Sequence, residues 1–439
     1  MRSRLTVALG RTARLAARVR GGGSGGTAFP GLVMERTDPG FLERTLSRLP
    51  RGVIVVSGTN GKTTTTKMVV QLLREQGLKV FTNRTGSNFV RGVLASLLTE
   101  VDAAGRLDAD IAVLELDEAH AVHFVARVRP RACLLLNVMR DQLDRFGEID
   151  YTASLLHSIA KATSDVVVLN GDDPRLAAPA FLEGVSARVV SFGTGEDLRS
   201  LFLSDDDLRT GQTGPRAHQD ESQIPGPRVT LEAIDGQRAT VRVDGASHEV
   251  NFAIPGVHNL LNACAALGVV LEVLGEDADL PGLLTTLGTV QAAFGRGEVL
   301  TLDGRPVQLS LVKNPAGFRM GLLSAAAQAQ SGEVVVVAIN DEYADGRDMS
   351  WLWDVDFSAL RPGGVAVVTG VRAWDMALRL RYDDVEVTDV EPDLRKAVAL
   401  MRRVAADTDR PMRIFTTYTA MLALRSILGE MTDVEEVMS

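Results

Sequence analysis

The stretch Val53–Lys67, VIVVSGTNGKTTTTK, decides the fold of the first half of this chain. Its first four residues are all apolar and predict a short buried strand, and the amphipathic pattern that continues to about Glu75 predicts a helix. The turn between them reads G-x-x-G-K-T, with Gly58, Gly61, Lys62 and Thr63 in order. Strand, glycine loop and helix in this order predict a phosphate-binding loop, because glycines let backbone N–H groups and the helix N-terminus point at an anion.

This loop contains the residues that we expect to hold a nucleoside triphosphate. Lys62 is expected to reach the terminal phosphates, and the hydroxyl of Thr63 is expected to coordinate Mg²⁺. The whole predicted nucleotide-binding segment is Gly58, Thr59, Asn60, Gly61, Lys62, Thr63 and Thr64. The alternative is a glycine turn beside a solvated lysine, but the order and spacing of the elements favour nucleotide binding.

Composition narrows the class of protein. With 439 residues, of which 45% are hydrophobic, the chain is expected to form two or three domains with substantial cores. Its net charge of −9 argues against nucleic acid as the main partner. The two cysteines, Cys133 and Cys264, both stand in apolar stretches and are predicted to be core residues of a cytoplasmic protein.

The first 20 residues carry six arginines and no acidic residue, interleaved with leucines and valines. Arginines interrupt any apolar core of a secretory signal, and no apolar run approaches the roughly 18 residues that a membrane span needs. Two interpretations stay open for this segment: a basic amphipathic helix that contacts anionic lipid at the inner face of the plasma membrane, or a helix that packs on the first domain. Residues 21–26, GGGSGG, predict a flexible link.

Carboxylates are expected beside the phosphate-binding loop. Ile111–Leu116 predicts a buried strand that carries Glu115 at its end, where a second Mg²⁺ ligand is expected. Glu118 is the alternate if the strand register differs. Asn88 lies in a polar loop after another predicted strand and is a candidate substrate-binding residue, although the loop could equally be a simple turn.

The loop sequence G-T-N-G-K-T-T-T resembles the Mur ligase superfamily, whose members join a carboxylate to an amine through an acyl phosphate made from ATP. Residues 255–263, PGVHNLLNA, match the superfamily stretch that holds the purine and ribose, which implies that Asn259 and Asn262 bind ATP. Residues 295–298, GRGE, resemble a string whose arginine reaches the ATP phosphates, which implies the same role for Arg296. Family members also place a glutamate at the position of Glu115, and 170–174, NGDDP, resembles their N-x-D-D motif.

The chain departs from the superfamily pattern at three positions. Residues 137–147 resemble the signature N-x-x-x-D-H-x-D-x-x-G, but Gln142 replaces the metal-binding histidine, which leaves a second metal site open. Leu156 and His157 stand where the family has a carbamylated lysine, and Leu311 replaces an aspartate that contacts ATP. Lys313, two residues later, is expected to steady the acyl phosphate.

The most unusual stretch is residues 340–357, NDEYADGRDMSWLWDVDF, with two tryptophans and five aspartates. Such density predicts a protein interface, while the alternative is that Trp351 and Trp353 pack in their own core. The string is similar to that of the MurT group of synthetase subunits. This resemblance implies a GatD-like class-I glutaminase partner whose catalytic cysteine and histidine are completed by Asp348, with Asp354 and Asp356 as alternates.

The expected fold class is α/β, with a Mur ligase-like P-loop central domain and a Rossmann-like C-terminal domain. Expected boundaries are 1–50 for the basic helix and linker, 51–298 for the ATP-binding domain and 299–439 for the last domain, which carries the partner-binding loop 340–357. A mobile insertion is expected at about 197–227; since it has no cysteine, no zinc ribbon is expected.

The resemblance implies ATP-dependent amidation of the D-glutamate α-carboxyl in the lipid II stem peptide, with ammonia from the partner. Two alternatives remain: a self-contained amino-acid ligase of the Mur or folylpolyglutamate type, and a non-catalytic P-loop regulatory scaffold.

Overall fold

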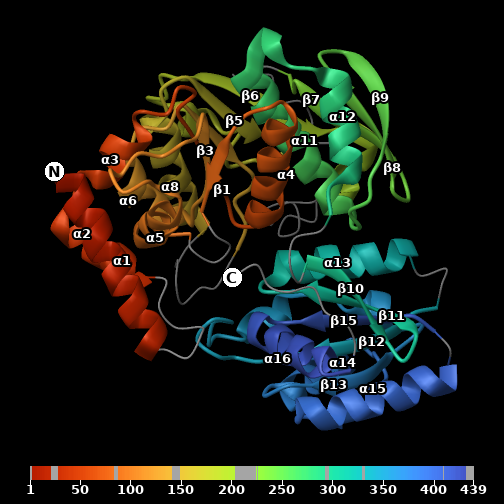
Figure 1. Ribbon diagram of the computed structural model, residues 1–439. Coiled ribbons are helices and arrows are strands. Elements are labelled where there is room, and N and C mark those ends of the chain that lie inside the picture. The colour runs from red at the N-terminus through yellow and green to blue at the C-terminus, as the bar shows by residue number, and fades with distance from the viewer. Residues whose placement is uncertain are drawn as a thin grey trace. The chain divides into compact units, whose positions relative to one another are not determined.

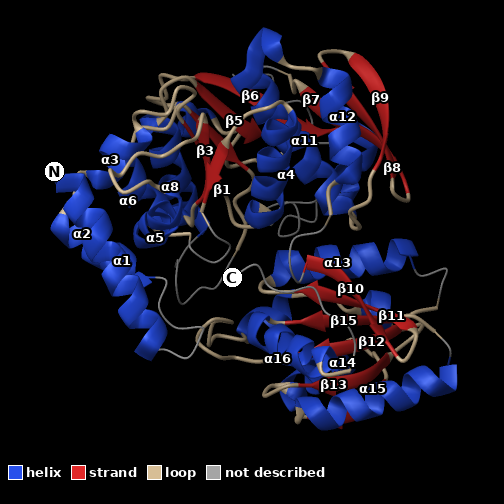
Figure 2. Ribbon diagram, viewed as in Figure 1, coloured by secondary structure: helices blue, strands red, loops and turns tan. Residues whose placement is uncertain are grey.

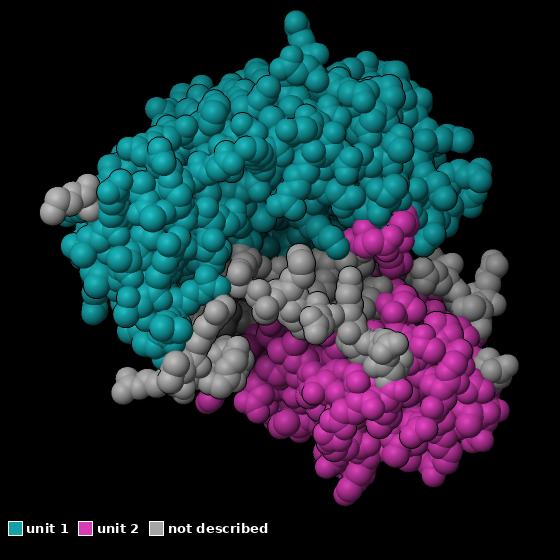
Figure 3. Space-filling model, viewed as in Figure 1, with its two compact units in different colours: residues 1–138, 150–252, 259–290 teal, residues 139–149, 253–258, 291–439 magenta. Residues whose placement is uncertain are grey.

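The computed structural model describes residues 2–20, 28–83, 88–140, 149–202, 224, 226–291, 296–328, 332–408 and 410–431. They form two compact units, coloured separately in Figure 3. Unit 1 comprises residues 1–138, 150–252 and 259–290, and unit 2 comprises residues 139–149, 253–258 and 291–439.

Unit 1 is built on a nine-stranded sheet with the order β2-β3-β1-β4-β5-β6-β7-β8-β9 (Figure 1). Its strands are β1 (Val53–Ser57), β2 (Val80–Thr82), β3 (Ile111–Glu115), β4 (Ala132–Leu135), β5 (Val166–Asn170), β6 (Arg188–Thr194), β7 (Val229–Asp235), β8 (Arg238–Val243) and β9 (Ala246–Asn251). The strands from β2 to β7 pair in parallel, and β7, β8 and β9 form an antiparallel meander. Every residue of β1 is buried because helices cover both faces of the parallel part, and this explains its uninterrupted apolar sequence (Figure 2).

The helices of unit 1 surround this sheet. They are α1 (Arg2–Arg20), α2 (Ala28–Thr37), α3 (Phe41–Leu46), α4 (Lys62–Glu75), α5 (Val90–Glu100), α6 (Glu118–Val125), α8 (Ile149–Ala162), α9 (Pro179–Leu182), most of α11 (Val257–Leu274) and α12 (Leu280–Thr289), with 3-10 turns η1 (Glu196–Leu201) and η2 (Gly275–Asp277). The segment 257–277 is long and apolar enough to cross a membrane, but 83% of it is buried inside the protein, as in a core helix. Cys133 and Cys264 are both buried and free.

Unit 2 contains a six-stranded sheet with the order β10-β11-β15-β12-β13-β14. Its strands are β10 (Arg296–Leu302), β11 (Arg305–Leu311), β12 (Val334–Ala338), β13 (Val365–Thr369), β14 (Val387–Glu391) and β15 (Met412–Thr416). All pairs are parallel except β10 with β11. The other elements are α13 (Pro315–Gln328), η4 (Ser350–Asp354), η5 (Ser358–Leu360), α14 (Ala373–Tyr382), α15 (Leu394–Thr408) and α16 (Tyr418–Gly429). Two apolar clusters, one that includes Met401 and one that includes Phe318, form the core of this unit.

The predicted α/β fold is confirmed: each unit contains a largely parallel sheet with helices packed on it. Parallel strands place their carboxyl ends at one edge, where loops from neighbouring strands meet. In unit 1 the neighbours of β1 are β3 and β4, so the loops after these three strands build the candidate nucleotide site.

Candidate functional site

The phosphate-binding loop spans residues 58–61, between the end of β1 and the first residue of α4. Two of its glycines have backbone angles that side chains rarely adopt, with φ of +134° at Gly58 and +86° at Gly61. A Cβ on Gly61 would also lie 2.6 Å from Oδ1 of Asn262. Glycine is therefore required at Gly61 both by backbone conformation and by the close approach of α11.

Lys62 lies at the start of α4 and is only 7% exposed. Its Nζ donates to the carbonyl oxygen of Gly58 at 2.5 Å and to Oε2 of Glu118 at 3.0 Å. Glu118 is itself only 3% exposed, so this is a buried ion pair at the first turn of α6. The pair holds the ammonium group over the loop, where an incoming phosphate would compete with the carboxylate for it.

Thr63 and Glu115 form the second contact of the site. The hydroxyl of Thr63 donates to Oε1 of Glu115 at 2.9 Å. Asn83 fixes the strand end that carries Glu115, because its side chain donates to the Glu115 carbonyl at 2.8 Å and accepts from the Glu115 amide at 2.9 Å. Among the described residues no group of three or more His, Cys, Asp or Glu side chains could hold a metal ion. A hydroxyl and one carboxylate nevertheless fit Mg²⁺, which takes its other ligands from water and phosphates.

Asn137 supports the loop from the end of β4. Its Oδ1 accepts from the Asn60 amide at 2.9 Å and its Nδ2 donates to the Asn60 carbonyl at 3.1 Å. The Asn137 carbonyl also accepts from the Thr59 amide at 3.1 Å. Asn137 stands within the signature at 137–147, but the sequence pattern gives it no role; the available signal is its place beside a run of apolar residues that predicts a strand.

Asp173 supports the same region from beyond β5, a role that the sequence pattern does not predict. Its carboxylate accepts hydrogen bonds from the backbone amides of Val138 at 2.7 Å, Arg175 at 3.0 Å and Leu176 at 3.1 Å. Burial of this side chain raises its pKa to about 6, although the three amide hydrogen bonds oppose that effect. Asp173 thus links the turn at residues 170–173 to Val138, which follows Asn137.

The remaining candidates of unit 1 are Asn88, Asn259 and Asn262, and the structure places them differently with respect to the loop 58–61. Asn262 touches the loop at Gly61, and its Nδ2 lies 3.4 Å from Oδ1 of buried Asn259. Asn88 is half-buried, and its carbonyl accepts from the amide of Asp117, between the two candidate glutamates. The structure therefore brings Asn262 directly to the phosphate-binding loop and Asn88 to the turn that follows β3.

Unit 2 contains the other two nucleotide candidates. Arg296 is the first residue of β10, but its side chain lies outside the described part of the chain. Lys313 follows β11 and is half-buried. Gln142 and residues 84–87 and 203–223 also lie outside the described residues, so the expectations for the metal signature and the insertion are not addressed there.

The loop 340–357 leaves β12 and is anchored to its own unit by three of its polar side chains. Asn340 donates from Nδ2 to Thr419 Oγ1 at 3.1 Å, and Asp345, only 3% exposed, accepts from the Thr419 amide at 2.8 Å. Asp341 forms an ion pair with Arg372 at 2.8 Å. These residues hold the loop against the start of α16 and the turn before α14.

The other three aspartates of the loop have local or surface contacts. Asp348 is half-buried, and its Oδ1 accepts from the Ser350 amide at 2.9 Å. Hydrogen bonds from Ser350 hold the pKa of Asp348 below its usual value, so this carboxylate is ionised at neutral pH. Asp356 makes the same kind of turn with Ser358, and Asp354 forms an exposed ion pair with Arg140 at 3.2 Å.

The two tryptophans of this loop have opposite environments. Trp351 is 5% exposed and packs against Phe318 with a ring-centre distance of 6.4 Å. The interface prediction is therefore wrong for Trp351, which fills the core of unit 2. Trp353 is 52% exposed and contacts Tyr382 edge to face at 5.1 Å.

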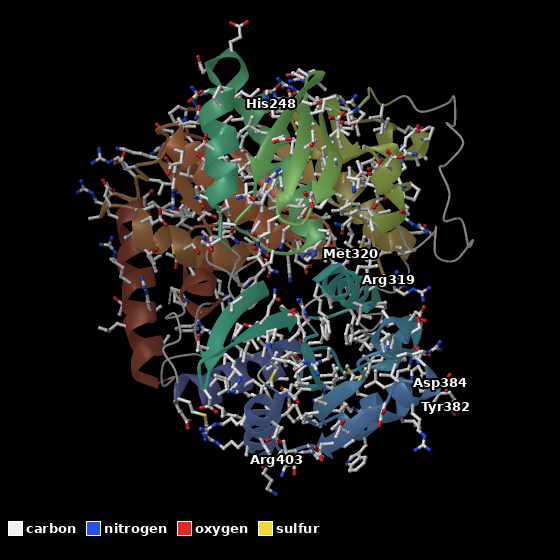
Figure 4. All side chains as sticks on the ribbon, turned by 90° about the vertical axis from the view of Figure 1, so that its right-hand side faces the viewer. His248, Arg319, Met320, Tyr382, Asp384 and Arg403 are labelled. Carbon is white, nitrogen blue, oxygen red and sulfur yellow. The ribbon has the colours of Figure 1, made fainter. Side chains whose placement is uncertain are left out.

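Exposed apolar side chains continue from Trp353 along α14. Trp374, Leu378 and Tyr382 are spaced four residues apart, so they lie on one face of the helix, and they are 66%, 52% and 69% exposed. Figure 4 shows Tyr382 at the outer edge of unit 2, next to Asp384. We call Trp353, Trp374, Leu378 and Tyr382 the α14 patch. Large apolar surfaces of this kind mark interaction sites more often than isolated exposed residues do.

Comparison with known proteins identifies the family. A model of the Mur ligase middle domain matches residues 56–270, and a model of the MurT ligase C-terminal region matches residues 311–421. A lipid II isoglutaminyl synthase subunit MurT from Staphylococcus aureus strain COL is 30% identical over 420 residues, covering 91% of this chain and 92% of the relative. The chain belongs to the MurT family.

A MurT subunit from Streptococcus pneumoniae strain R6 is 29% identical over 437 residues, covering 94% of this chain and 95% of the relative. Among solved structures, MurF ligase from Thermotoga maritima in complex with ADP has a TM-score of 0.66 at 18% identity, covering 91% of this chain and 84% of that chain. Membership in the MurT family makes this chain a carbon–nitrogen ligase of the Mur type. The likeness to MurF shows that the two proteins share a fold.

Proposed function

We propose that this MurT-family chain is the synthetase subunit of a lipid II isoglutaminyl synthase. It amidates the α-carboxyl of D-glutamate in the lipid II stem peptide to D-isoglutamine, uses ATP, and receives ammonia from a GatD-like glutaminase. The observation that carries the proposal is the combination of a complete phosphate-binding loop in unit 1 with a MurT-type acidic and aromatic loop in unit 2. The names of the two full-length relatives give the substrate class.

The proposed chemistry has two steps. A carboxylate oxygen of the substrate attacks the γ-phosphorus of ATP, an O–P bond forms, and ADP leaves. Ammonia then attacks the acyl carbon, loses a proton, and inorganic phosphate leaves, so that a primary amide is formed. Water must be excluded from both steps, because it would hydrolyse the acyl phosphate.

The residues of unit 1 act by position and charge. Lys62 exchanges Glu118 for the terminal phosphates and offsets the charge that spreads over the transferring phosphoryl group. Thr63 and Glu115 would hold Mg²⁺, which would supply further charge neutralisation when bound. Arg296 and Lys313 of unit 2 are proposed to act on the phosphates and the acyl phosphate, as the family resemblance implies.

The nitrogen must come from outside the chain as ammonia. Class-I glutaminases use a reactive cysteine, but both cysteines of this chain are fully buried. Burial raises the pKa of both Cys133 and Cys264 to about 12, and the thiolate needed for attack is then scarce. A separate glutaminase is therefore proposed, with the α14 patch as its docking surface and Asp348 as the carboxylate that orients its histidine.

The test is an amidation assay with purified chain, ATP, Mg²⁺ and lipid II in detergent. Ammonium salt at pH above 8 should support amidation without a partner, whereas glutamine should support it only when a GatD-like glutaminase is added. Mass spectrometry would detect the loss of about one mass unit that conversion of a carboxyl to an amide produces. Absence of product with ammonium would contradict the synthetase assignment.

The same assay separates the two alternatives. Incorporation of a radiolabelled amino acid in place of ammonia would indicate a self-contained ligase. ATP turnover that is independent of a glutamate-bearing muropeptide would favour a regulatory scaffold. This alternative is considered because Leu156 and Leu311 stand at positions where the superfamily has a lysine and an aspartate.

A further inference from the structure

Helix α1 packs on α2 and α5 of the same unit through one face. Thr6, Val7 and Ala13 on this face are between 0% and 9% exposed. Gly10 lies between them, and a Cβ there would come within 2.9 Å of Met34 and 3.0 Å of Leu98. This close contact with α2 and α5, visible for α2 in Figure 1, fixes which side of α1 points away from the protein.

The opposite face of α1 is apolar and exposed. Leu5, Leu9 and Leu15 are 58%, 41% and 65% exposed, and the side chains between them on this face are the exposed Ala8, Thr12 and Ala16. At 3.6 residues per turn these six positions span an arc of roughly 120°, directly across the helix from Gly10. Packing on unit 1 therefore uses one apolar face of α1 and leaves a second one uncovered.

Arginines border the exposed apolar face on both sides. Arg4 and Arg11 lie along one edge, and Arg2 lies along the other. Arg11 donates to the Val101 carbonyl at 3.0 Å, and Arg2 lies 3.7 Å from buried Asp38, which also pairs with Arg44. α1 contains no acidic residue, in contrast with the net charge of −9 of the whole chain. Positive charge is thus concentrated at the edges of an exposed leucine surface.

We propose that the outer face of α1 binds the surface of a bilayer that contains anionic phospholipid. Leucines would enter the boundary between headgroups and acyl chains, while exposed Arg4 extends along the apolar surface to reach lipid phosphates and Arg2 and Arg11 add positive charge at its edges. A basic rim complements an anionic membrane surface, and attraction of this kind is additive over several arginines. The inference deepens the proposed function, because it explains how an enzyme for a lipid-linked substrate stays near that substrate.

The experiment is co-sedimentation of the full chain with vesicles of phosphatidylcholine alone and of phosphatidylcholine with 30% phosphatidylglycerol. We expect at least tenfold stronger partitioning to the anionic vesicles at low salt, and a loss of this preference at high salt. The triple variant Leu5→Gln, Leu9→Gln, Leu15→Gln should reduce binding at least tenfold, and Arg4→Gln should reduce it several-fold. Tyr151→Gln changes an exposed aromatic residue elsewhere on unit 1 and should bind like the parent.

Several outcomes would overturn the inference. Equal binding of the parent and the triple variant would exclude α1 as the lipid-binding surface, and so would no binding of the parent to anionic vesicles. A dimer that dissociates in the triple variant, detected by light scattering, would assign the face to a second copy of the chain. Amidation of lipid II in detergent should be unchanged in the triple variant, so membrane binding and the proposed function can fail separately. Circular dichroism with thermal unfolding checks that the triple variant is folded.

Discussion

The phosphate-binding loop and the loop 340–357 both follow a buried parallel strand, but they direct their polar side chains differently. In the first, the side chains of Lys62 and Thr63 bond to carboxylates after β3 and at its end, and the backbone of Asn60 bonds to the side chain of Asn137. In the second, Asn340, Asp341 and Asp345 anchor the loop, while Asp348 accepts a hydrogen bond within its own turn and Trp353 is exposed. The first loop is therefore held by contacts within unit 1, whereas the second keeps an exposed aromatic ring, as expected of a loop that contacts a partner.

The largest expected effect is on the second loop, and it should appear with one nitrogen source only. Asp348→Asn should lower glutamine-dependent amidation on the order of 10³–10⁴-fold, because a triad without its carboxylate orients the histidine poorly. Ammonium-dependent amidation should change less than about twofold, since no step on the acyl phosphate uses this residue. Asp356→Asn removes a matching turn aspartate that is an alternate for the triad, so it tests the choice of Asp348 and should leave amidation with both nitrogen sources nearly unchanged. An equal fall with both nitrogen sources would assign Asp348 to folding instead.

A change in the first loop should instead affect both nitrogen sources. Lys62→Ala is expected to reduce amidation with glutamine and with ammonium by roughly 10²–10³-fold, because it removes a preorganised charge at the transferring phosphoryl group. Lys79→Ala is a suitable control, since Lys79 is exposed and its ammonium group pairs with the surface carboxylate of Asp108. Initial rates with saturating ATP provide the measurement. Activity of the Lys62 variant above a tenth of the parent would contradict the assigned role.

Glu115 and Glu118 allow the predicted metal ligand to be distinguished from the partner of Lys62. Glu115→Gln should raise the Mg²⁺ concentration for half-maximal activity about 10–100-fold, because it removes a charged oxygen next to Thr63. Glu118→Gln should leave that concentration nearly unchanged, because Glu118 contacts Lys62 rather than Thr63. Magnesium titrations of both variants test this assignment. The reverse pattern would make Glu118 the metal ligand.

The α14 patch should contribute affinity without taking part in the chemistry. Trp374→Ala and Tyr382→Ala are each expected to weaken glutaminase binding about 10–100-fold, since exposed aromatic residues are the usual anchors of such interfaces. Leu422→Ala, on α16 and outside the patch, should have little effect. Binding can be followed by titration calorimetry, with ammonium-dependent amidation as the check on the fold. Unaltered affinity in both aromatic variants would place the partner elsewhere.

A further effect concerns the free energy of unfolding rather than activity, and comes from Asp173, behind the first loop. Its pKa of about 6 in the folded protein lies above the ordinary value of 3.8, so folding favours the protonated carboxyl. The associated stability is fully present below about pH 4 and is lost as pH rises through 6, a change of roughly 3 kcal/mol. Asp173→Asn cannot titrate and should lack this part of the pH dependence. Urea unfolding of both proteins from pH 4 to 7 measures it; parallel curves would contradict the assignment.

Local patterns were sufficient for the strands and for the loop between β1 and α4, because apolar runs and glycine spacing depend on neighbours in sequence. They were not sufficient for Asn137 and Asp173, whose roles arise from contacts with residues 60 and 138 across neighbouring strands. Trp351 shows the same dependence on distant contacts. Composition predicted an interface from both tryptophans, but Trp351 packs in the core of unit 2 whereas Trp353 is exposed.

By itself, the sequence determined that the chain is an α/β protein with a glycine loop between a strand and a helix, and its strings of loop residues indicated the family. Only the tertiary structure decided which candidates meet: Lys62 with Glu118, Thr63 with Glu115, and Asn262 with Gly61. It also separated buried Trp351 from exposed Trp353, and the packed face of α1 from its exposed leucines. The physical reason is that burial and pairing depend on side chains brought together from distant parts of the chain, which no local pattern encodes.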